Sequence, residues 1–559
     1  MSTQETVVYV AARFDTMEPD RPTATAVAVR GPRIIAVGSL EEVTAGLPDG
    51  SYRVDESLTK TYVTPGLIDQ HLHPILGAST LMTEVISTED WVLPGRTYPA
   101  ARSPKEYLDR LTAAHEGLSD PTEWLFSWGY HALWHGPISR SVLDGISSTR
   151  PIGIWQRSAH EWYLNSAAIQ ALGLTEEDAR SIAPEQTDWA QGHWWEAGFF
   201  AGLLPRIGPI LLNRERLTAG LHQLVDYLRM NGVTAFNEPG IIWDAEPYDL
   251  YREILGAPDV PFSTSFMVDG RSQAQAGIRP EDAVRDAEEQ LARVPQGNVG
   301  LLDRHVKLFA DGAIIAQLMQ MADPYLDDAG SPDPCHHGEW LMTPDILEAY
   351  ARVYWNAGWT IHTHVNGDLG LEVLLGILER AAADHPREDH RSVIVHFANS
   401  TEEQIDRIAA LGAIVSANPY YVSGFADTYS AHGVGPERAD SMVRAASVLA
   451  RGIPLSLHSD APMAPAAPLL LASCAVNRIT QSGRVAGPEQ RISVHEALRA
   501  VTIGAAYSWR LEHEIGSITV GKVANFTALG ADPYAVDPRE LHEIPVLGVV
   551  YQGRWFPAP

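Results

Sequence analysis

The sequence is poor in cysteine, in cationic side chains and in long apolar runs. Only Cys335 and Cys474 occur among 559 residues, so a framework of disulfide bonds is excluded. Lys and Arg total 41 against 70 Asp and Glu, and the resulting net charge of −29 argues against nucleic acid or an anionic membrane as a partner. No stretch approaches the roughly 20 apolar residues that a membrane span requires.

The start of the sequence lacks the basic segment and apolar core of a secretory signal, so we expect a cytoplasmic protein. Hydrophobic residues make up 45% and charged residues 20% of the chain, which is ordinary globular composition. The length suggests two or three domains and ample material for a large core.

Both ends of the chain are rich in short β-like runs, while the middle alternates such runs with helical stretches. Gly31 and Pro32 are typical of a hairpin turn between two strands. We therefore predict one small β-sandwich that combines residues 1–62 with residues 511–559.

Eight apolar runs recur in the middle, most of them followed by a helical stretch. This pattern predicts an α/β fold with a (β/α)8 TIM-type barrel over residues 63–510. One of the helices is expected to begin after Ser400, with Glu403 completing a capping box. The eight runs are TYVTPGLIDQHLH, GVTAFNEPG, VPFSTSFMVDG, RHVKLFADGA, WTIHTHVNGD, SVIVHFANS, GAIVSANPYYV and IPLSLHSDAP.

Residues 83–229 are too many for one β/α unit, so we predict a subdomain that is inserted after the first strand and covers the barrel mouth. Tryptophans are frequent in this segment. They form either the core of the subdomain or the wall of a pocket for an apolar or aromatic group. Trp194 is the candidate for such a pocket wall.

The run TPGLIDQHLHP places His71 and His73 at the end of the first predicted strand. Residues i and i+2 of a strand point to the same side, so the two imidazoles could hold one metal ion. Two unrelated histidines in a turn are the alternative. Ligand-type side chains at the ends of other predicted strands favour the metal site, and these are Lys307, His364, His396 and Asp460.

These residue types suit one kind of chemistry. Histidine nitrogen and carboxylate oxygen bind zinc or related divalent metals, which lower the pKa of bound water towards about 7. Asp460 can then take the proton from that water and deliver it to a leaving amine. The active site of a barrel lies at the carboxyl ends of its strands, where these residues are expected.

The runs PGLIDQHLHP, IHTHVNGD, VIVHFANS and LHSDAP resemble the motifs of the amidohydrolase superfamily. The runs VKLFADGAI, RPIGIWQRSAHEWYLNSAA and IGSITVGKVAN are similar to the amidohydrolase family 3 branch, which includes N-substituted formamide deformylases. The resemblance covers nearly the whole chain. It is highly specific for the fold and weakly specific for the substrate.

The resemblance implies a role for each candidate ligand. His71 and His73 correspond to ligands of the more buried metal, and His364 and His396 to ligands of a second metal. Lys307 corresponds to a lysine that is carboxylated by carbon dioxide and bridges two metals. A surface or salt-bridged lysine is the alternative for Lys307, but its place in an apolar strand disfavours that reading.

The resemblance also assigns the catalytic groups. Asp460 corresponds to the catalytic aspartate, which is a metal ligand as well, and His160 to a residue that holds the substrate carbonyl. One or two divalent ions are implied, with zinc the expected metal. Homo-oligomers are common in the superfamily, so a homodimer or a higher homo-oligomer is expected.

The sequence departs from the family pattern near the expected pocket. Ser158 and Ala159 precede His160 where Asp and Gly are usual, and Val395 precedes His396 where Glu is usual. Glu238 ends the second predicted strand in place of a His-Asp pair and is expected to face the mouth. The substrate should therefore not be copied from any relative.

Further residues are expected around the mouth. Tyr420 and His432 follow the seventh predicted strand and are candidates for substrate binding together with Glu238. His362 and His458 each lie two residues before a candidate ligand and are expected to be packed, hydrogen-bonded partners.

The loop Cys335–Trp340 contains Cys, two His and Glu, but its spacing matches no zinc module. It is expected to be a lid or a substrate loop rather than a second metal site.

The combined reading is a metal-dependent hydrolase that cleaves a non-peptide carbon–nitrogen bond, of amide or N-formyl type, in a small apolar or aromatic substrate. A cyclic amidase or a deaminase could use the same centre, and so could a lyase or a hydratase. A noncatalytic metal-binding protein is the alternative outside enzymes, and retention of the full ligand set argues against it.

Overall fold

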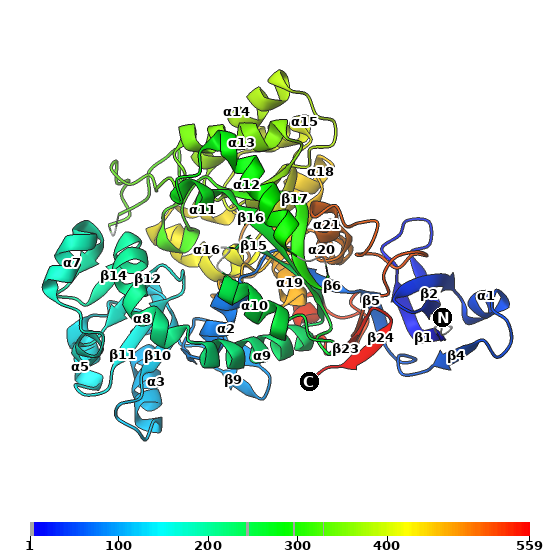
Figure 1. Cartoon of the computed structure of the whole chain (residues 1–559), viewed down its shortest axis with the longest axis horizontal. Helices are drawn as coiled ribbons and strands as arrows, with labels where there is room; N and C mark the ends of the chain where they lie inside the picture. The colour runs from blue at the N-terminus through cyan, green and yellow to red at the C-terminus, as the bar shows by residue number, and fades with distance from the viewer. Residues whose placement is uncertain (1–4, 242–244, 295–296, 328) are drawn as a thin grey trace. The chain divides into compact units, whose positions relative to one another are not determined.

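The computed structural model describes residues 5–241, 245–294, 297–327 and 329–559, which form two compact units. The first unit comprises the chain up to Leu72, Leu228–Asp460 and Ala466–Pro559. The second unit comprises His73–Tyr227 and Ala461–Pro465. Figure 1 shows the helices and strands of both units.

Eight parallel strands form a nearly closed sheet in the first unit, as the sequence predicted. Each of the eight apolar runs supplies one strand, and the hydrogen-bonded order of the strands follows their order in the chain. Strands buried on both faces read as continuous apolar runs, which is why the sequence reveals them. The strands are β6 (Leu67–Asp69), β15 (Val233–Ile241), β16 (Ser263–Asp269), β17 (Val299–Phe309), β18 (Thr360–Val365), β19 (Val393–His396), β20 (Ile414–Ala417) and β21 (Leu455–Leu457).

Helices follow most of these strands, which is the arrangement of a TIM-type barrel. In α14, for example, Leu371, Leu374 and Leu378 recur at helical spacing and are all buried. The helices of the first unit after β15 are α10 (Ala245–Ile254), α11 (Gly270–Gln275), α12 (Pro280–Arg293), α13 (Pro344–Asn356), α14 (Asp368–Asp384), α15 (Glu402–Leu411), α16 (Tyr420–His432), α17 (Pro436–Asp440), α18 (Ala445–Ala450), α19 (Pro468–Asn477), α20 (Val494–Ala500) and α21 (Ile503–Ser508).

The predicted start of α15 is wrong by one residue. Thr401, not Ser400, is the N-cap, and it forms a capping box with Gln404. Both hydroxyl residues have a polar side chain three residues later, so the sequence allows two registers for the cap. The Ser400 carbonyl instead accepts a hydrogen bond from Arg444 Nε at 2.9 Å.

Hydrogen bonds join the carboxyl ends of β21 and β6, the two edge strands of the barrel sheet. The Asp460 N–H donates to the His71 carbonyl at 2.9 Å. The Asp69 carboxylate accepts bonds from the Ser459 N–H at 3.0 Å and from the Ser459 hydroxyl at 2.5 Å. This closure holds the chain segments that carry His71 and Asp460 side by side.

Strands from both ends of the chain form a second sheet in the first unit (Figure 1). The predicted turn at Gly31 and Pro32 separates two of its strands, and Gly31 has a φ of 57°, which suits glycine. In sheet order the strands are β24 (Arg554–Pro557), β23 (Val546–Tyr551), β22 (Phe526–Leu529), β5 (Tyr62–Pro65), β1 (Thr6–Asp15), β2 (Thr23–Arg30) and β3 (Arg33–Gly38), with β4 (Tyr52–Asp55) beside β1.

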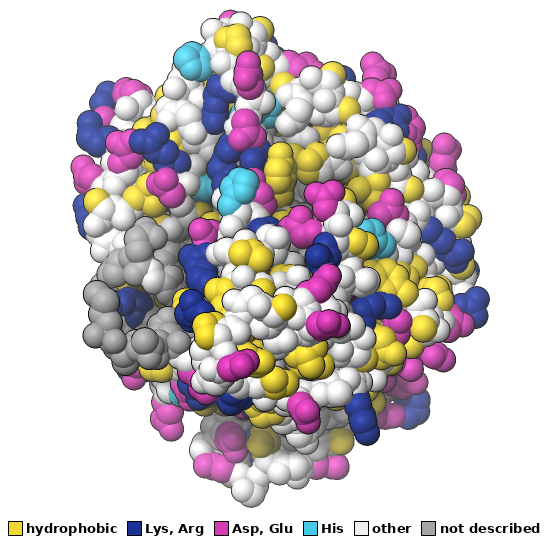
Figure 2. Space-filling view, turned by 90° about the vertical axis from the view of Figure 1, so that its right-hand side faces the viewer, with side chains coloured by type: hydrophobic (Ala, Val, Ile, Leu, Met, Phe, Trp, Pro, Cys, Tyr) yellow, Lys and Arg dark blue, Asp and Glu magenta, His cyan; other side chains and the backbone are white. Residues whose placement is uncertain are grey.

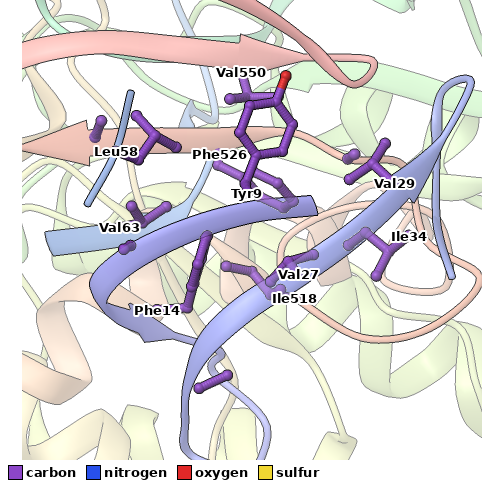
Figure 3. Close-up of a cluster of buried hydrophobic side chains, with 14 of the residues drawn as sticks. Tyr9, Phe14, Val27, Val29, Ile34, Leu58, Val63, Ile518, Phe526 and Val550 are labelled. Atoms are coloured by element: carbon purple, nitrogen blue, oxygen red, sulfur yellow. The ribbon is translucent and has the colours of Figure 1, made fainter. Parts of the chain in front are cut away.

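The core of this sheet draws on both termini. Figure 3 shows Tyr9 and Phe14 from β1 clustered with Ile518, Phe526 and Val550 from the last part of the chain. Removal of these side chains from water is the force that brings the two ends together. A two-layered sandwich remains a prediction.

The Thr527 hydroxyl connects the terminal sheet to the barrel. It donates to the Gly232 carbonyl at 2.7 Å and accepts a bond from the Leu67 N–H at 3.1 Å. Gly232 has a φ of 72°, and a Cβ at this position would lie 2.5 Å from the Thr527 methyl group. Glycine is therefore required where β15 begins beside the terminal sheet.

The surface carries charges of both signs. Figure 2 shows acidic and basic side chains interspersed with hydrophobic ones over one face of the molecule. Within the described ranges of the chain, no helix has both the length and the hydropathy needed to cross a bilayer.

The second unit is built around a six-stranded sheet in the order β13, β14, β12, β11, β10 and β7. Four of its tryptophans, Trp128, Trp155, Trp162 and Trp194, are at most 2% exposed and belong to its core. The main elements are α2 (Pro74–Leu81), β7 (Glu84–Val85), β8 (Trp91–Leu93), β9 (Arg96–Tyr98), α3 (Pro104–Gly117), β10 (Leu125–Tyr130), α4 (Ala132–His135), α5 (Arg140–Ile146), β11 (Ile152–Gln156), β12 (Glu161–Leu164), α6 (Ser166–Ala171), α7 (Glu176–Ile182), β13 (Thr187–Asp188), β14 (His193–Trp195), α8 (Leu204–Leu211) and α9 (Arg214–Met230).

A buried arginine ties the short segment Ala461–Pro465 into the second unit. The Arg157 side chain is fully buried and forms two hydrogen bonds to the Glu89 carboxylate, at 2.5 and 2.6 Å. The same guanidinium donates to the Met463 carbonyl at 2.8 and 3.0 Å. Arg157 therefore holds the backbone of the segment Ala461–Pro465, which directly follows Asp460 in the chain.

We expect Arg157→Met to destabilise the second unit by about 3–5 kcal/mol, because the substitution removes a fully buried cation and leaves the Glu89 carboxylate, which is 16% exposed, without it. The measurement is the midpoint of thermal unfolding, with limited proteolysis to identify the unit that opens. Arg180→Met is the matched control, since Arg180 is exposed and its ion pair with Glu176 lies on the surface of α7. Equal midpoints for Arg157→Met and the wild type would show that the pair is not structural.

Candidate metal centre

The carboxyl ends of β6, β19 and β21 bring three histidines and one carboxylate together. Ligand atoms of His71, His396 and His458 all lie within 4.8 Å of one another. Asp460 Oδ1 lies 3.2 Å from His71 Nε2, and Asp460 Oδ2 lies 3.8 Å from His396 Nδ1. Of these four residues, the sequence predicted His71, His396 and Asp460 as metal ligands, and the structure places all three in one cluster.

Strand β18 adds His364 to the cluster. Its ring centroid lies 4.3 Å from that of His396. The Asn366 amide nitrogen lies 3.1 Å from His364 Nε2 and can only donate. His364 Nε2 therefore accepts this bond through its lone pair, and that nitrogen could bind a metal ion only if the Asn366 amide moved away.

The histidines of the cluster are held in the neutral form. Burial, followed by the charge of Lys307, lowers the pKa of His71 well below its usual value and that of His364 to about 3. Burial, followed by the neighbouring His364, also lowers the pKa of His396. Neutral imidazole is the form that ligates metals, so the cluster is ready to bind a cation without losing protons.

Lys307 of β17 is a basic side chain buried beside the histidine cluster. It is fully buried, and its Nζ has no hydrogen-bond partner in the part of the chain that the structure describes. Burial lowers the pKa of Lys307 to about 7, although Asp460, Asp269 and Glu238 act in the opposite direction. Much of this amine is therefore neutral near pH 7, and a neutral amine can react with carbon dioxide.

Asp460 differs from the histidines in its exposure. Its side chain is 18% exposed, whereas those of His71 and His396 are 3% and 1% exposed. Asp460 therefore reaches solvent while the imidazoles of His71 and His396 do not. Asp460 and His396 also have positive φ angles, 57° and 77°, a strained conformation that often marks functional residues.

His458 fixes the orientation of His396 through a chain of hydrogen bonds. The Ser416 hydroxyl donates to Gln70 Oε1 at 2.7 Å, so it accepts from His458 Nδ1 at 2.9 Å. His458 Nε2 must then accept from His396 Nδ1, which lies 3.0 Å away. This order leaves His396 Nε2 unprotonated and available to a metal.

Three of the predicted site residues belong to the second unit. His73 is the N-cap residue of α2, and its N–H donates to the Ala461 carbonyl at 2.9 Å. His160 Nδ1 lies 3.0 Å from Glu196 Oε1, and the His160 side chain is 25% exposed. Trp194 lies within the core of this unit. The approach of these side chains to the cluster stays a prediction.

The remaining predicted substrate contacts lie in the first unit. Glu238, near the end of β15, is buried and close enough to Lys307 to influence its pKa. Tyr420 is buried in the first turn of α16, while His432 is exposed at its last residue. Burial, followed by the charge of Asp460, raises the pKa of the phenol of the next residue, Tyr421. Contact of these residues with a substrate stays a prediction.

The other candidate ligand groups serve the fold. His362 is buried and bonded to His305, with 3.0 Å between His305 Nδ1 and His362 Nε2, as expected for a packed histidine. In the loop Cys335–Trp340, His336 stacks on Tyr325 and His337 Nδ1 lies 3.0 Å from a backbone carbonyl. Across the described residues, no group of three metal-ligating side chains includes this loop.

Two side chains beside the cluster lie outside the predicted set. Phe309, the last residue of β17, stacks on His364 with 5.7 Å between the ring centroids. The Arg271 guanidinium carbon lies over the Phe309 ring, 4.4 Å from the ring centroid. Phe309 ends β17, and Arg271 follows β16. Neither side chain is of a type that binds metals, so the pattern of candidate ligands in the sequence does not include them.

Comparisons with known proteins agree with this geometry. The model of the amidohydrolase family, Amidohydro_3, matches residues 57–556. The chain is 25% identical over 525 residues to the YtcJ protein of Bacillus subtilis, covering 90% of this chain and 91% of that protein. It is 25% identical over 571 residues to the N-substituted formamide deformylase of Arthrobacter pascens, covering 99% of this chain and 98% of that enzyme.

A solved structure shares the fold. It is the crystal structure of an uncharacterized metal-dependent hydrolase from Pyrococcus horikoshii, which matches 96% of this chain and 99% of its own length with a TM-score of 0.70 and 21% identity. At that identity the likeness concerns the fold alone.

We expect His458→Leu to weaken metal binding by about 10- to 100-fold, because His396 loses the acceptor that fixes its tautomer. The measurement is a competition titration with a metal-binding dye. His458→Gln, whose carbonyl oxygen can still accept from His396, should recover part of the affinity. His390→Leu is the control, since His390 is a buried histidine at the amino end of β19. Equal affinities in His458→Leu and wild type would contradict this role.

Proposed function

Because the chain belongs to the amidohydrolase family and is therefore a metal-dependent hydrolase acting on carbon–nitrogen bonds, we propose that it cleaves the amide or N-formyl bond of a small, partly apolar substrate. One observation carries this proposal. Neutral histidines, a solvent-reaching aspartate and an unpartnered buried lysine converge at the carboxyl end of one barrel.

The donor set fits a divalent metal centre. His71 and His73, from the paired-histidine motif, together with His364, His396 and Asp460, offer nitrogen and carboxylate donors of the kind that zinc prefers. When bound, such an ion acts as a Lewis acid that polarises a carbonyl and lowers the pKa of water. One ion or two can be accommodated by this set of residues.

Lys307 completes the centre if it carries a carbamate. An ammonium group cannot ligate a metal, whereas a carbamate offers two oxygens. The unpartnered Nζ and the pKa of about 7 support this modification, because both leave the amine free to react. Burial without a hydrogen bond would otherwise be a cost with no compensation.

Asp460 is the group that moves protons. Its Oδ1 lies beside His71 and its side chain reaches solvent, so it can take a proton from an attacking water molecule and pass it to the leaving amine. His160 is proposed to donate a hydrogen bond to the substrate oxygen as negative charge develops there. Its pairing with Glu196 would keep the imidazole oriented.

The substrate class rests on relatives as well as on the site. The deformylase of Arthrobacter pascens aligns over nearly the full length of both chains. An N-formyl compound is therefore the first substrate to test, followed by other small amides.

We expect about two zinc-like ions per wild-type chain, and fewer in Lys307→Ala, because the variant cannot form a bridging carbamate. Elemental mass spectrometry of the purified proteins measures the ratio. Added formate or acetate should restore part of the activity of Lys307→Ala on an N-formyl amine, since a free carboxylate can replace the carbamate. Lys522→Ala, which removes a buried lysine bonded to Ser517 in the terminal sheet region, is the control.

One ion in both proteins would make the centre mononuclear and remove Lys307 from it. Absence of bound metal after reconstitution would contradict the hydrolytic mechanism.

A further inference from the structure

Arg271 is an uncompensated cation at the carboxyl end of the barrel. It lies in the first turn of α11, directly after β16, and is half-buried. In the described part of the chain its guanidinium makes no ion pair and no hydrogen bond, and its Nε is buried without a partner. Burial of a cationic donor without a partner costs free energy, so the arrangement calls for an anion.

This lack of a side-chain partner is unusual among the described arginines that are not exposed. Acidic residues outnumber basic ones by 70 to 41, so partners for arginine are plentiful. Arg391, Arg407 and Arg484 of the same unit each bind two carboxylates at distances of 2.6–2.8 Å. Arg271 is held instead by an aromatic ring, with 4.4 Å from its guanidinium carbon to the Phe309 centroid.

Phe309 connects Arg271 to the metal centre. The Phe309 ring stacks on His364 at 5.7 Å with an interplanar angle of 29°, and Lys307 Nζ lies 5.5 Å from the Phe309 centroid. The charge of Arg271 is also close enough to lower the pKa of both His364 and Lys307. The guanidinium is therefore one aromatic ring away from the residues proposed to bind the metal.

The three stacked side chains reach solvent. Arg271, Phe309 and His364 are each partly exposed, whereas His71, His396 and Lys307 are buried. A ligand that entered at the strand ends would meet the stack before the buried ligands. The Arg271 guanidinium carbon lies over the Phe309 ring at 4.4 Å from its centroid, and a guanidinium is planar and suits a planar, two-point partner.

We propose that Arg271 binds a carboxylate group of the substrate, so that the enzyme acts on amides or N-formyl compounds whose amine part carries a carboxylate. A carboxylate matches the planar fork of the guanidinium. A phosphate dianion fits less well, because Asp269 and Glu238 lie within electrostatic reach of the same region and would repel the larger charge. The proposal rests on the proposed function, since it names the substrate class of that site.

The test compares two substrates that differ only in the carboxylate: N-formylphenylalanine and N-formyl-2-phenylethylamine. We expect Arg271→Met to lower kcat/KM for N-formylphenylalanine by about 10- to 100-fold more than for the uncharged substrate, because a charge-assisted bond is lost. Arg285→Met is the matched control. It removes an exposed guanidinium from α12 that pairs with Asp282, and it should leave kcat/KM for both substrates unaffected.

A binding measurement separates failure of this inference from failure of the proposed function. Calorimetry of the zinc-loaded proteins with 3-phenylpropanoate and 3-phenylpropanamide requires no turnover. Weaker binding of the carboxylate alone to Arg271→Met would support the anion site, even if the wild type cleaved neither N-formyl compound and the proposed function failed.

Three results would overturn the inference. The first is an equal loss for both substrates together with a lower metal content in Arg271→Met, which would assign Arg271 to the metal centre. The second is no difference between Arg271→Met and wild type in either assay. The third is a wild-type protein that binds 3-phenylpropanoate no better than 3-phenylpropanamide.

Discussion

Burial of ionisable side chains is the constraint on which the barrel mouth depends. Removal from water disfavours the charged form of every group, so the histidines become neutral and the pKa of Lys307 falls to about 7. The same force raises the pKa of Asp69 to about 7. A metal centre needs neutral imidazole and a reactive amine, and both follow from burial before any cation is bound.

The closure of the barrel gives these groups their geometry. Asp69 accepts two bonds from Ser459, and the adjacent Asp460 N–H donates to the His71 carbonyl. These bonds link the first and last strands at His71 and Asp460 or within two residues of them. The residues that close the barrel sheet are thus the same as, or next to, the residues of the proposed metal centre. A loss of these hydrogen bonds would separate His71 from Asp460.

The fold was largely predictable from the sequence because parallel barrel strands are buried on both faces and read as apolar runs. The clustering of His71, His396 and Asp460 could be predicted for a related reason, since polar side chains of ligand type at the ends of such runs are rare without a function. Family resemblance then suggested the proposed roles of Lys307 and His160, which spacing alone does not reveal.

The remaining features depend on contacts that no local pattern records. The chain from Gln70 through Ser416 and His458 to His396 joins residues far apart in sequence. The start of α15 at Thr401 rather than Ser400 was a choice between two equivalent caps. Arg271 escaped notice because its significance lies in the absence of a partner, which only the folded structure can show.

Charge balance links the metal, the carbamate and Arg271. Conversion of a protonated Lys307 to a carbamate would change the local charge by two units, in a site already influenced by Asp460, Asp269 and Glu238. Such an anion would be costly to bury alone, so carboxylation and binding of divalent cations should occur together. The proposed substrate carboxylate would add one further negative charge to this balance, at Arg271, which makes no ion pair in the described part of the chain.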